Sequence, residues 1–197
     1  MSLLDGIIGA LRAFAKSPSF SISYDITGTG YVNKKSLGKL MTGILTAYEN
    51  PKYAPTIVDG KVTVTHCNDA VRDVAGFMDC HDFAGMNADE IYAFMEAGKG
   101  WKEVLMRDAQ ELANEGSLVV AGLPSRVLDE AHGHVCVIRP GEVVWSEHWK
   151  SSVPSVMNVG GQNFILRFKT SDGSFIEAGI NGAFQIIPKF FAWEASL

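Results

Sequence analysis

Hydrophobic residues recur at helical spacing in the first quarter of the chain. The spacing predicts an amphipathic helix over residues 3–15 and a second over residues 36–48. The Asn50-Pro51 pair ends the second helix, because proline lacks the N–H that a helix needs and restricts the residue before it. The composition changes near residue 50. The pattern therefore predicts a helical N-terminal extension over residues 1–50 and a main domain over residues 51–197.

Three further helices are expected before the pattern changes. The first begins close to Cys67, directly after a short strand-like stretch. The second has a capping-box start, with Asn87 as the cap and Glu90 three residues later. The third runs over residues 102–115 and ends at Gly116, because glycine readily adopts the backbone conformation that terminates a helix.

The second half of the chain has the pattern of strands. Short runs rich in Val, Ile and Phe are separated by turn residues such as Pro140-Gly141 and Asp172-Gly173. Helices first and strands later predict an α+β fold, with helices packed on an antiparallel sheet. The expected strands cover residues 118–121, 135–138, 143–145, 156–159, 164–168, 175–178 and 186–193.

The composition narrows the classes of partner. The chain has 197 residues, of which 47% are hydrophobic, and its net charge is −5. The lysines and arginines form no cluster, which argues against a nucleic-acid partner, because phosphate binding needs grouped cations. No run approaches the roughly 20 apolar residues of a membrane span. The first 16 residues lack the features of a secretion signal, so we expect synthesis in the cytoplasm.

Cys67 is the candidate nucleophile among three cysteines. A thiol at the start of a helix lies near unpaired backbone N–H groups and the positive end of the helix dipole. Both stabilise the thiolate, which is the reactive form, and the same N–H groups can donate to an oxyanion. Cys136 alternates within an apolar strand and is expected in the core, and Cys80 lies in a polar turn with nothing nearby to activate it.

His134 is the candidate general base for this thiol. It follows Gly133 and opens an apolar strand, where its side chain would be held rigidly. His132 ranks second, because it would share a strand face with His134 if the strand began two residues earlier.

The base also needs a group that orients its ring. Asn158 lies among Val and Met in the expected neighbouring strand, where a polar side chain needs a hydrogen-bond partner. Asn163 and Glu147 remain alternatives. His66 and Asn68 beside the nucleophile, together with His132, are expected to line the substrate site. The histidines and Cys67 have no short metal-ligand spacing, so neither a metal nor another cofactor is expected.

Several sequence blocks occur in a family-specific order. They include Cys67-Asn68-x-x-Val71-x-Asp73, Asn87-Ala88-x-x-Ile91, Gly116-x-Leu118-Val119 and Gly133-His134-Val135. Over residues 65–160 the chain resembles NlpC-type and CHAP-type cysteine peptidases, and most closely the peptidoglycan amidase effectors of type VI secretion. The resemblance implies a papain-like fold. Cys67 matches its nucleophile, His134 matches the base, and Asn158 matches the third polar position.

The resemblance also implies a substrate. It indicates hydrolysis of an amide bond in the murein stem peptide, with the bond between D-glutamate and diaminopimelate expected first. The alternatives are an N-acetylmuramoyl-L-alanine amidase, a cysteine acyltransferase or deamidase of the same fold, and a binding module with an unreactive Cys67. A hydrolase of this kind would act in the periplasm or on the cell wall after export or lysis, and a cognate inhibitor (immunity) protein could be its partner.

Overall fold

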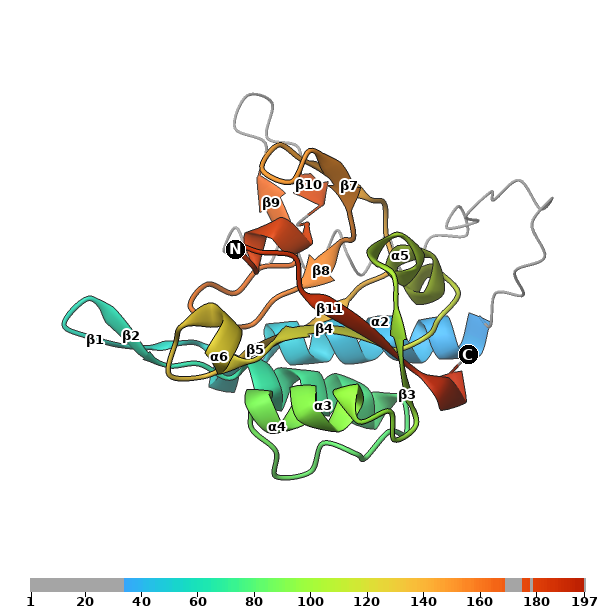
Figure 1. Cartoon of the computed structure of the whole chain (residues 1–197), viewed down its shortest axis with the longest axis horizontal. Helices are drawn as coiled ribbons and strands as arrows, with labels where there is room; N and C mark the ends of the chain where they lie inside the picture. Colours follow the sequence, from blue (N-terminus) through green and yellow to red (C-terminus); the bar gives the residue numbers. More distant parts are fainter. Residues whose placement is uncertain (1–33, 169–174, 178, 197) are drawn as a thin grey trace. The chain divides into compact units, whose positions relative to one another are not determined.

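A computed structural model describes residues 34–168, 175–177 and 179–196, and the helix expected over residues 3–15 lies outside these ranges. Its main feature is a five-stranded sheet in the order β3-β11-β4-β5-β8, in which all neighbours are antiparallel (Figure 1). The strands of this sheet are β3 (Trp101–Val104), β4 (Val119–Leu123), β5 (His134–Ile138), β8 (Val156–Met157) and β11 (Lys189–Trp193).

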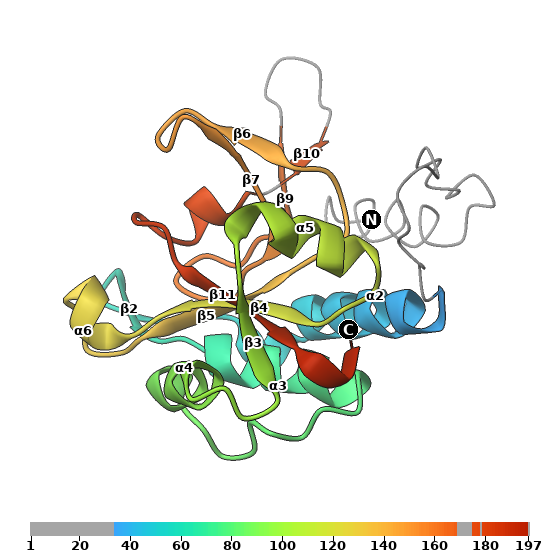
Figure 2. The ribbon, with the colours of Figure 1, turned by 45° about the vertical axis from the view of Figure 1, so that its right-hand side comes forward.

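Helices cover both faces of this sheet. The longer ones are α2 (Lys34–Glu49), α3 (Cys67–Phe77), α4 (Ala88–Glu96) and α5 (Met106–Asn114), and α6 (Ser125–Leu128) is a single short turn. In two views, α3 and α4 lie on one side of the sheet and α5 on the other (Figures 1 and 2). The described residues therefore form an α+β fold, as the change of pattern along the sequence predicts.

The alternation of side chains along the strands places a core on each face of the sheet. On the α5 face, Ala109 and Ala113 pack with Ala121, Ile138 and Phe190, all of them buried. On the other face, the ring of Tyr92 from α4 meets the edge of Phe191, with 5.7 Å between the ring centroids. Strands β4 and β5 are thus buried on both sides, and they carry almost only apolar residues.

Helix α2 belongs to the same compact unit as the sheet. Leu40 and Ile44 are fully buried, and α2 packs along α3. The sequence predicts a boundary near residue 50, but the structure has none there. The physical reason is the apolar stripe of α2, which packs against α3 within the same unit.

Three of the expected helices are confirmed. They are α2, α3 and α4, and Asn87 and Glu90 form the predicted capping box at the start of α4. The prediction of one helix over residues 102–115 is wrong at its start. Residues Trp101–Val104 form β3, which pairs with β11 near the far end of the chain, and α5 begins only at Met106.

Each of the expected strands is present: β4 and β5 are one residue longer than expected, whereas those from residue 156 onward are shorter. Outside the main sheet, β6 (Val144–Ser146) pairs with β7 (Ser151–Val153), and β9 (Leu166–Phe168) pairs with β10 (Phe175–Glu177). Three-residue 3-10 turns occur at Pro51–Tyr53, Ile180–Gly182 and Glu194–Ser196.

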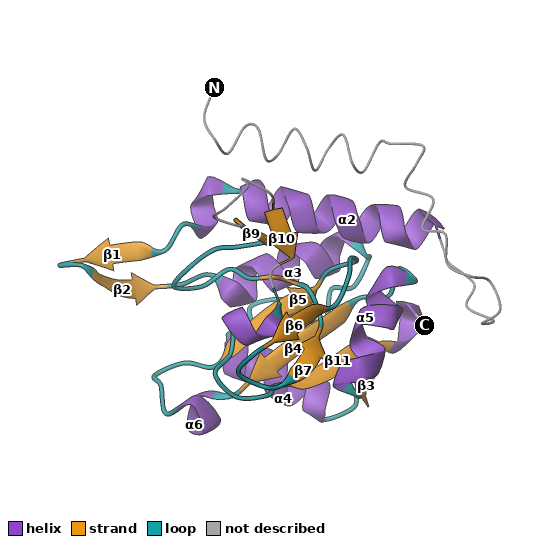
Figure 3. Ribbon diagram, turned by 90° about the horizontal axis from the view of Figure 1, so that it is seen from above, coloured by secondary structure: helices purple, strands orange, loops and turns teal. Residues whose placement is uncertain are grey.

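A hairpin precedes the candidate nucleophile, and its second strand is the strand-like stretch expected before Cys67. Its strands are β1 (Thr56–Val58) and β2 (Lys61–Val64), and it extends away from the helices (Figures 1 and 3). Gly60 has a φ of +75°, a conformation that glycine adopts without steric cost, and it makes the turn. The hairpin delivers the chain directly to the start of α3. Within the described ranges, none of the helices has the length and apolar character of a membrane span.

Candidate active site

Cys67 is the first residue of α3, and His66 is the N-cap. The side chain of His66 makes no capping hydrogen bond, so it satisfies none of the first N–H groups of the helix. Cys67 is only 4% exposed, which places its sulfur below the surface at the positive end of α3.

The surroundings of Cys67 favour the thiolate. Burial raises the pKa of the thiol, but the His134 imidazole and the N–H groups of Val135 and Asn68 bond to the sulfur and lower it by more. The pKa of Cys67 is therefore below that of an ordinary thiol. A lowered pKa raises the fraction of the thiol that is present as the nucleophilic thiolate.

His134 opens β5 and pairs with Leu123 of β4. Its ring packs against Phe184, with 5.1 Å between the ring centroids. Burial lowers the pKa of His134, but the hydrogen bond and the charge of Cys67, together with Asn158, raise it by more. A lowered thiol pKa and a raised imidazole pKa favour a thiolate–imidazolium pair.

Asn158 fixes the orientation of this ring. Its Oδ1 lies 2.7 Å from His134 Nε2, and its Nδ2 donates to the carbonyl oxygen of Gln162 over 2.8 Å. Because Nδ2 faces an acceptor, Oδ1 must face a donor, and Nε2 therefore carries the hydrogen. The other ring nitrogen, Nδ1, is left to exchange a proton with Cys67.

Asn163, one of the alternatives to Asn158, acts on the neighbouring loop. Its Oδ1 accepts a hydrogen bond from the Gly160 N–H (2.9 Å), and its Nδ2 donates to the carbonyl oxygen of Tyr53 (2.8 Å). A Cβ on Gly160 would lie 3.1 Å from Cε1 of His134, so glycine allows the loop to close on the ring. Asn163 thus stabilises the Gly160 loop beside the His134 ring, and neither of these hydrogen bonds involves the imidazole.

Glu147, the other alternative, bonds to groups other than the His134 ring. It is exposed and bonds to Trp145 and Lys150 in the β6–β7 hairpin. Of the three candidates for the orienting group, the structure brings Asn158 to His134.

The residues expected to line the substrate site lie in different places. His66 is half-buried, with Nδ1 3.2 Å from a carboxylate oxygen of Asp69. The Asn68 side chain donates to the carbonyl oxygen of Met86 over 3.1 Å, which ties the start of α3 to the following loop. His132 is exposed and lies before β5, so it does not share a strand face with His134 as predicted. The reason is that β5 begins only at His134.

Asp89 is a residue of this site that the sequence analysis does not identify. It lies in the first turn of α4, and its carboxylate accepts hydrogen bonds from the N–H groups of Ser125 (2.7 Å) and Gly133 (2.9 Å). The available signal was an extra acidic residue inside the capping box, two residues after the Asn87 cap.

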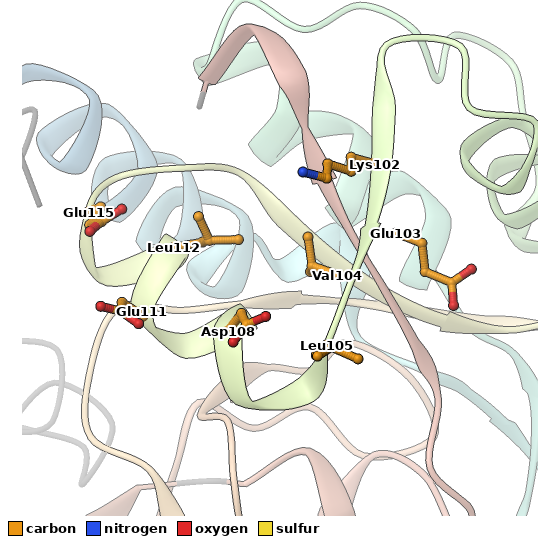
Figure 4. Close-up of a pocket in the computed structure, with 8 residues that line it drawn as sticks. All are labelled: Lys102, Glu103, Val104, Leu105, Asp108, Glu111, Leu112 and Glu115. Atoms are coloured by element: carbon orange, nitrogen blue, oxygen red, sulfur yellow. The ribbon is translucent and has the colours of Figure 1, made fainter.

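No part of the described chain groups three or more His, Cys, Asp or Glu side chains in a way that could hold a metal ion. One surface hollow, of about 320 Å³, lies between β3 and α5 and is separate from Cys67, His134 and Asn158 (Figure 4). Half of its lining residues are acidic, and the full set is Lys102, Glu103, Val104, Leu105, Asp108, Glu111, Leu112 and Glu115.

The three central side chains can carry out nucleophilic chemistry. A thiol with a lowered pKa, a base within hydrogen-bond reach and an amide that orients the base make up the arrangement required for covalent catalysis by cysteine. Comparison with protein families finds no family model that matches the chain, and a search of curated proteins finds no similar sequence.

Proposed function

We propose that this protein is a papain-like cysteine hydrolase that cleaves an amide bond of the peptidoglycan stem peptide. One observation carries the proposal: Cys67 at the start of α3 bonds to His134, and Asn158 holds the far side of the same ring. The three residues come from three separate elements. Their alignment supports a catalytic role more strongly than a structural one.

The proposed reaction begins with proton transfer from the Cys67 thiol to Nδ1 of His134. The thiolate attacks the carbonyl carbon of the amide, and the N–H groups at the start of α3 stabilise the oxyanion. The imidazolium then gives its proton to the leaving amine as the C–N bond breaks. A thioester on Cys67 remains.

Water completes the cycle. Neutral His134 removes a proton from a water molecule, which attacks the thioester carbonyl, and the carboxylic acid leaves as the C–S bond breaks. The sulfur takes back the proton, and the pair returns to its starting state. Asn158 keeps Nε2 protonated throughout, so Nδ1 remains the nitrogen that exchanges protons.

The order of elements supports the papain-like assignment. The nucleophile opens a helix, the base opens a later antiparallel strand, and the orienting amide follows the adjacent strand, β8. The choice of substrate rests on the resemblance of residues 65–160 to peptidoglycan amidases. The D-glutamate–diaminopimelate bond is the first candidate, and the muramoyl–alanine amide is the second.

The test is digestion of purified peptidoglycan, with the products identified by mass spectrometry. Wild-type protein should release fragments cut at a single kind of amide bond, and Cys67→Ala should release none. Cys136→Ala is the matched control, because Cys136 is a fully buried thiol of the neighbouring strand. Unchanged muropeptides after incubation with folded wild-type protein would contradict the hydrolase. Transfer of the acyl group to a second amine would identify an acyltransferase instead.

A further inference from the structure

Asp89 joins the two ends of the loop between β4 and β5. Its Oδ1 accepts a hydrogen bond from the Ser125 N–H at one end, and its Oδ2 accepts one from the Gly133 N–H at the other. Burial raises the pKa of Asp89, but these two donors lower it by more, so the carboxylate stays charged near neutral pH. Hydrogen bonds to a charged acceptor are stronger than neutral ones.

Gly133 allows the carboxylate to approach this closely. A Cβ at Gly133 would lie 2.9 Å from the carbonyl oxygen of Leu123 and 3.0 Å from Oδ1 of Asp89, which is too close for either atom. His134 is the next residue. Because a single peptide unit joins the two residues, any displacement of Gly133 also moves the His134 imidazole.

We infer that Asp89 is a positioning residue, which holds His134 in line with Cys67 by clamping the start of β5. The anchor is firm, because the capping box of Asn87 and Glu90 fixes the first turn of α4 and α4 packs against both β4 and β5. The proposed function supplies the reaction in which this placement matters. A misplacement of about 1 Å can slow an enzyme by about 100-fold.

A simpler role for Asp89 is to stabilise α4 through the helix dipole. Glu90 lies in the same turn, is also acidic and accepts a hydrogen bond from the Asn87 N–H of its own capping box. Glu90→Gln is therefore the matched control for Asp89→Asn. Each substitution removes one charge from the same helix end, but only Asp89→Asn alters the clamp.

Two properties would be measured for wild type, Asp89→Asn, Glu90→Gln and Gly133→Ala. The first is the pH dependence of Cys67 alkylation by iodoacetamide, followed by peptide mass spectrometry. The second is kcat and KM on a synthetic stem peptide that contains the D-glutamate–diaminopimelate bond. Circular dichroism would establish that each variant is folded.

In Asp89→Asn, an NH2 group replaces one carboxylate oxygen and faces a backbone N–H, so one end of the clamp opens. We expect kcat to fall by about 10- to 100-fold with little change in KM. The alkylation curve should move to higher pH, toward an ordinary thiol with a pKa near about 8.5. Gly133→Ala should give the same pair of changes, and the two substitutions together should be less than additive. Glu90→Gln should change neither property.

The inference is overturned if folded Asp89→Asn keeps the wild-type alkylation curve, or if Glu90→Gln moves it equally. If Asp89→Asn does not fold, the alkylation curve of Gly133→Ala tests the inference instead, because this variant keeps the Asp89 carboxylate. A wild-type curve in folded Gly133→Ala would then overturn the inference. The alkylation curve needs no peptide substrate. If wild type fails to cut the stem peptide, the proposed function fails, and the curve still tests the role of Asp89.

Discussion

Helix α3 has a buried cysteine near each end, and the two thiols lie in opposite surroundings. Cys67 is the first residue of the helix, and Cys80 follows its last turn. Their exposed fractions are 4% and 2%, so both sulfurs are removed from solvent. Near Cys67 are backbone N–H groups and the His134 imidazole, whereas Cys80 lies 3.6 Å from a carboxylate oxygen of Asp82.

The pKa values of the two thiols respond accordingly. Burial raises the pKa of both. The Asp82 N–H lowers the pKa of Cys80 too little to reverse this shift, whereas the N–H donors and the cation at Cys67 do reverse it. For Cys80, burial and the negative charge of Asp82 raise the pKa to about 11. Cys136 in β5 is enclosed completely, and its pKa is also raised. Burial therefore does not distinguish a reactive cysteine from an inert one; the groups that face the sulfur do.

The largest expected effect comes from removing the cation at the Cys67 end. His134→Ala should lower hydrolysis of peptidoglycan by about 10²- to 10⁴-fold, because His134 is the base that bonds to the thiol. His81→Ala, near the Cys80 end, is the control and should leave the rate unchanged, since His81 is exposed. The rates would be measured by release of soluble fragments. Similar rates for the two variants would contradict the difference between the Cys67 and Cys80 ends of α3.

The pH dependence of hydrolysis should reflect the same pair. The pKa of Cys67 is lowered and that of His134 is raised, and both shifts favour the thiolate–imidazolium form at intermediate pH. The rate should rise with pH as the thiolate forms and fall as the imidazolium loses its proton, by about tenfold per unit on each side. A profile of kcat/KM that rises once, near the pKa of an ordinary thiol, would contradict the coupling.

Asn158→Ala should have an intermediate effect. It leaves the Nε2–H of His134 without its acceptor, at a cost of about 1–3 kcal/mol. This corresponds to about 5- to 150-fold in kcat if the whole cost falls on the transition state. Asn163→Ala is informative beside it, because Asn163 bonds to the backbone of Gly160 and Tyr53 and its effect should be smaller. An equal loss in both variants would remove the special role of Asn158.

The smallest effect on activity is expected at the Cys80 end. Asp82 accepts hydrogen bonds from the Cys80 thiol and from the Trp101 indole (3.1 Å). Asp82→Ala should lower the free energy of unfolding by about 1–3 kcal/mol, measured by urea denaturation, and leave hydrolysis at the wild-type rate. A loss of hydrolysis in the folded variant would show that the two ends of α3 are not independent.

Local patterns in the sequence were sufficient to predict much of the structure around Cys67. The start of α3 and the cap of α4 follow from residues within one helical turn. His134 and Asn158 could also be found, because one opens an apolar strand and the other is a polar residue among buried ones.

Features that depend on distant partners could not be found in the same way. Trp101–Val104 forms a strand because β11, almost 90 residues later, pairs with it. Asp89 has its role because a loop from β4 to β5 folds back onto α4. Cys80, flanked by polar residues, is buried because the chain packs over it, and no nearby spacing indicates this. Tertiary contacts override local preference in each case.

The most direct test of the account is the pH dependence of alkylation at each cysteine of the wild-type protein and of His134→Ala. In the wild type, Cys67 should react with iodoacetamide well below the pKa of about 8.5 of a free thiol, and Cys80 should react only in strongly alkaline solution. His134→Ala should shift the Cys67 curve upward and leave the Cys80 curve in place. A Cys67 curve that coincides with that of Cys80, or that does not respond to the loss of His134, would contradict a thiolate–imidazolium pair.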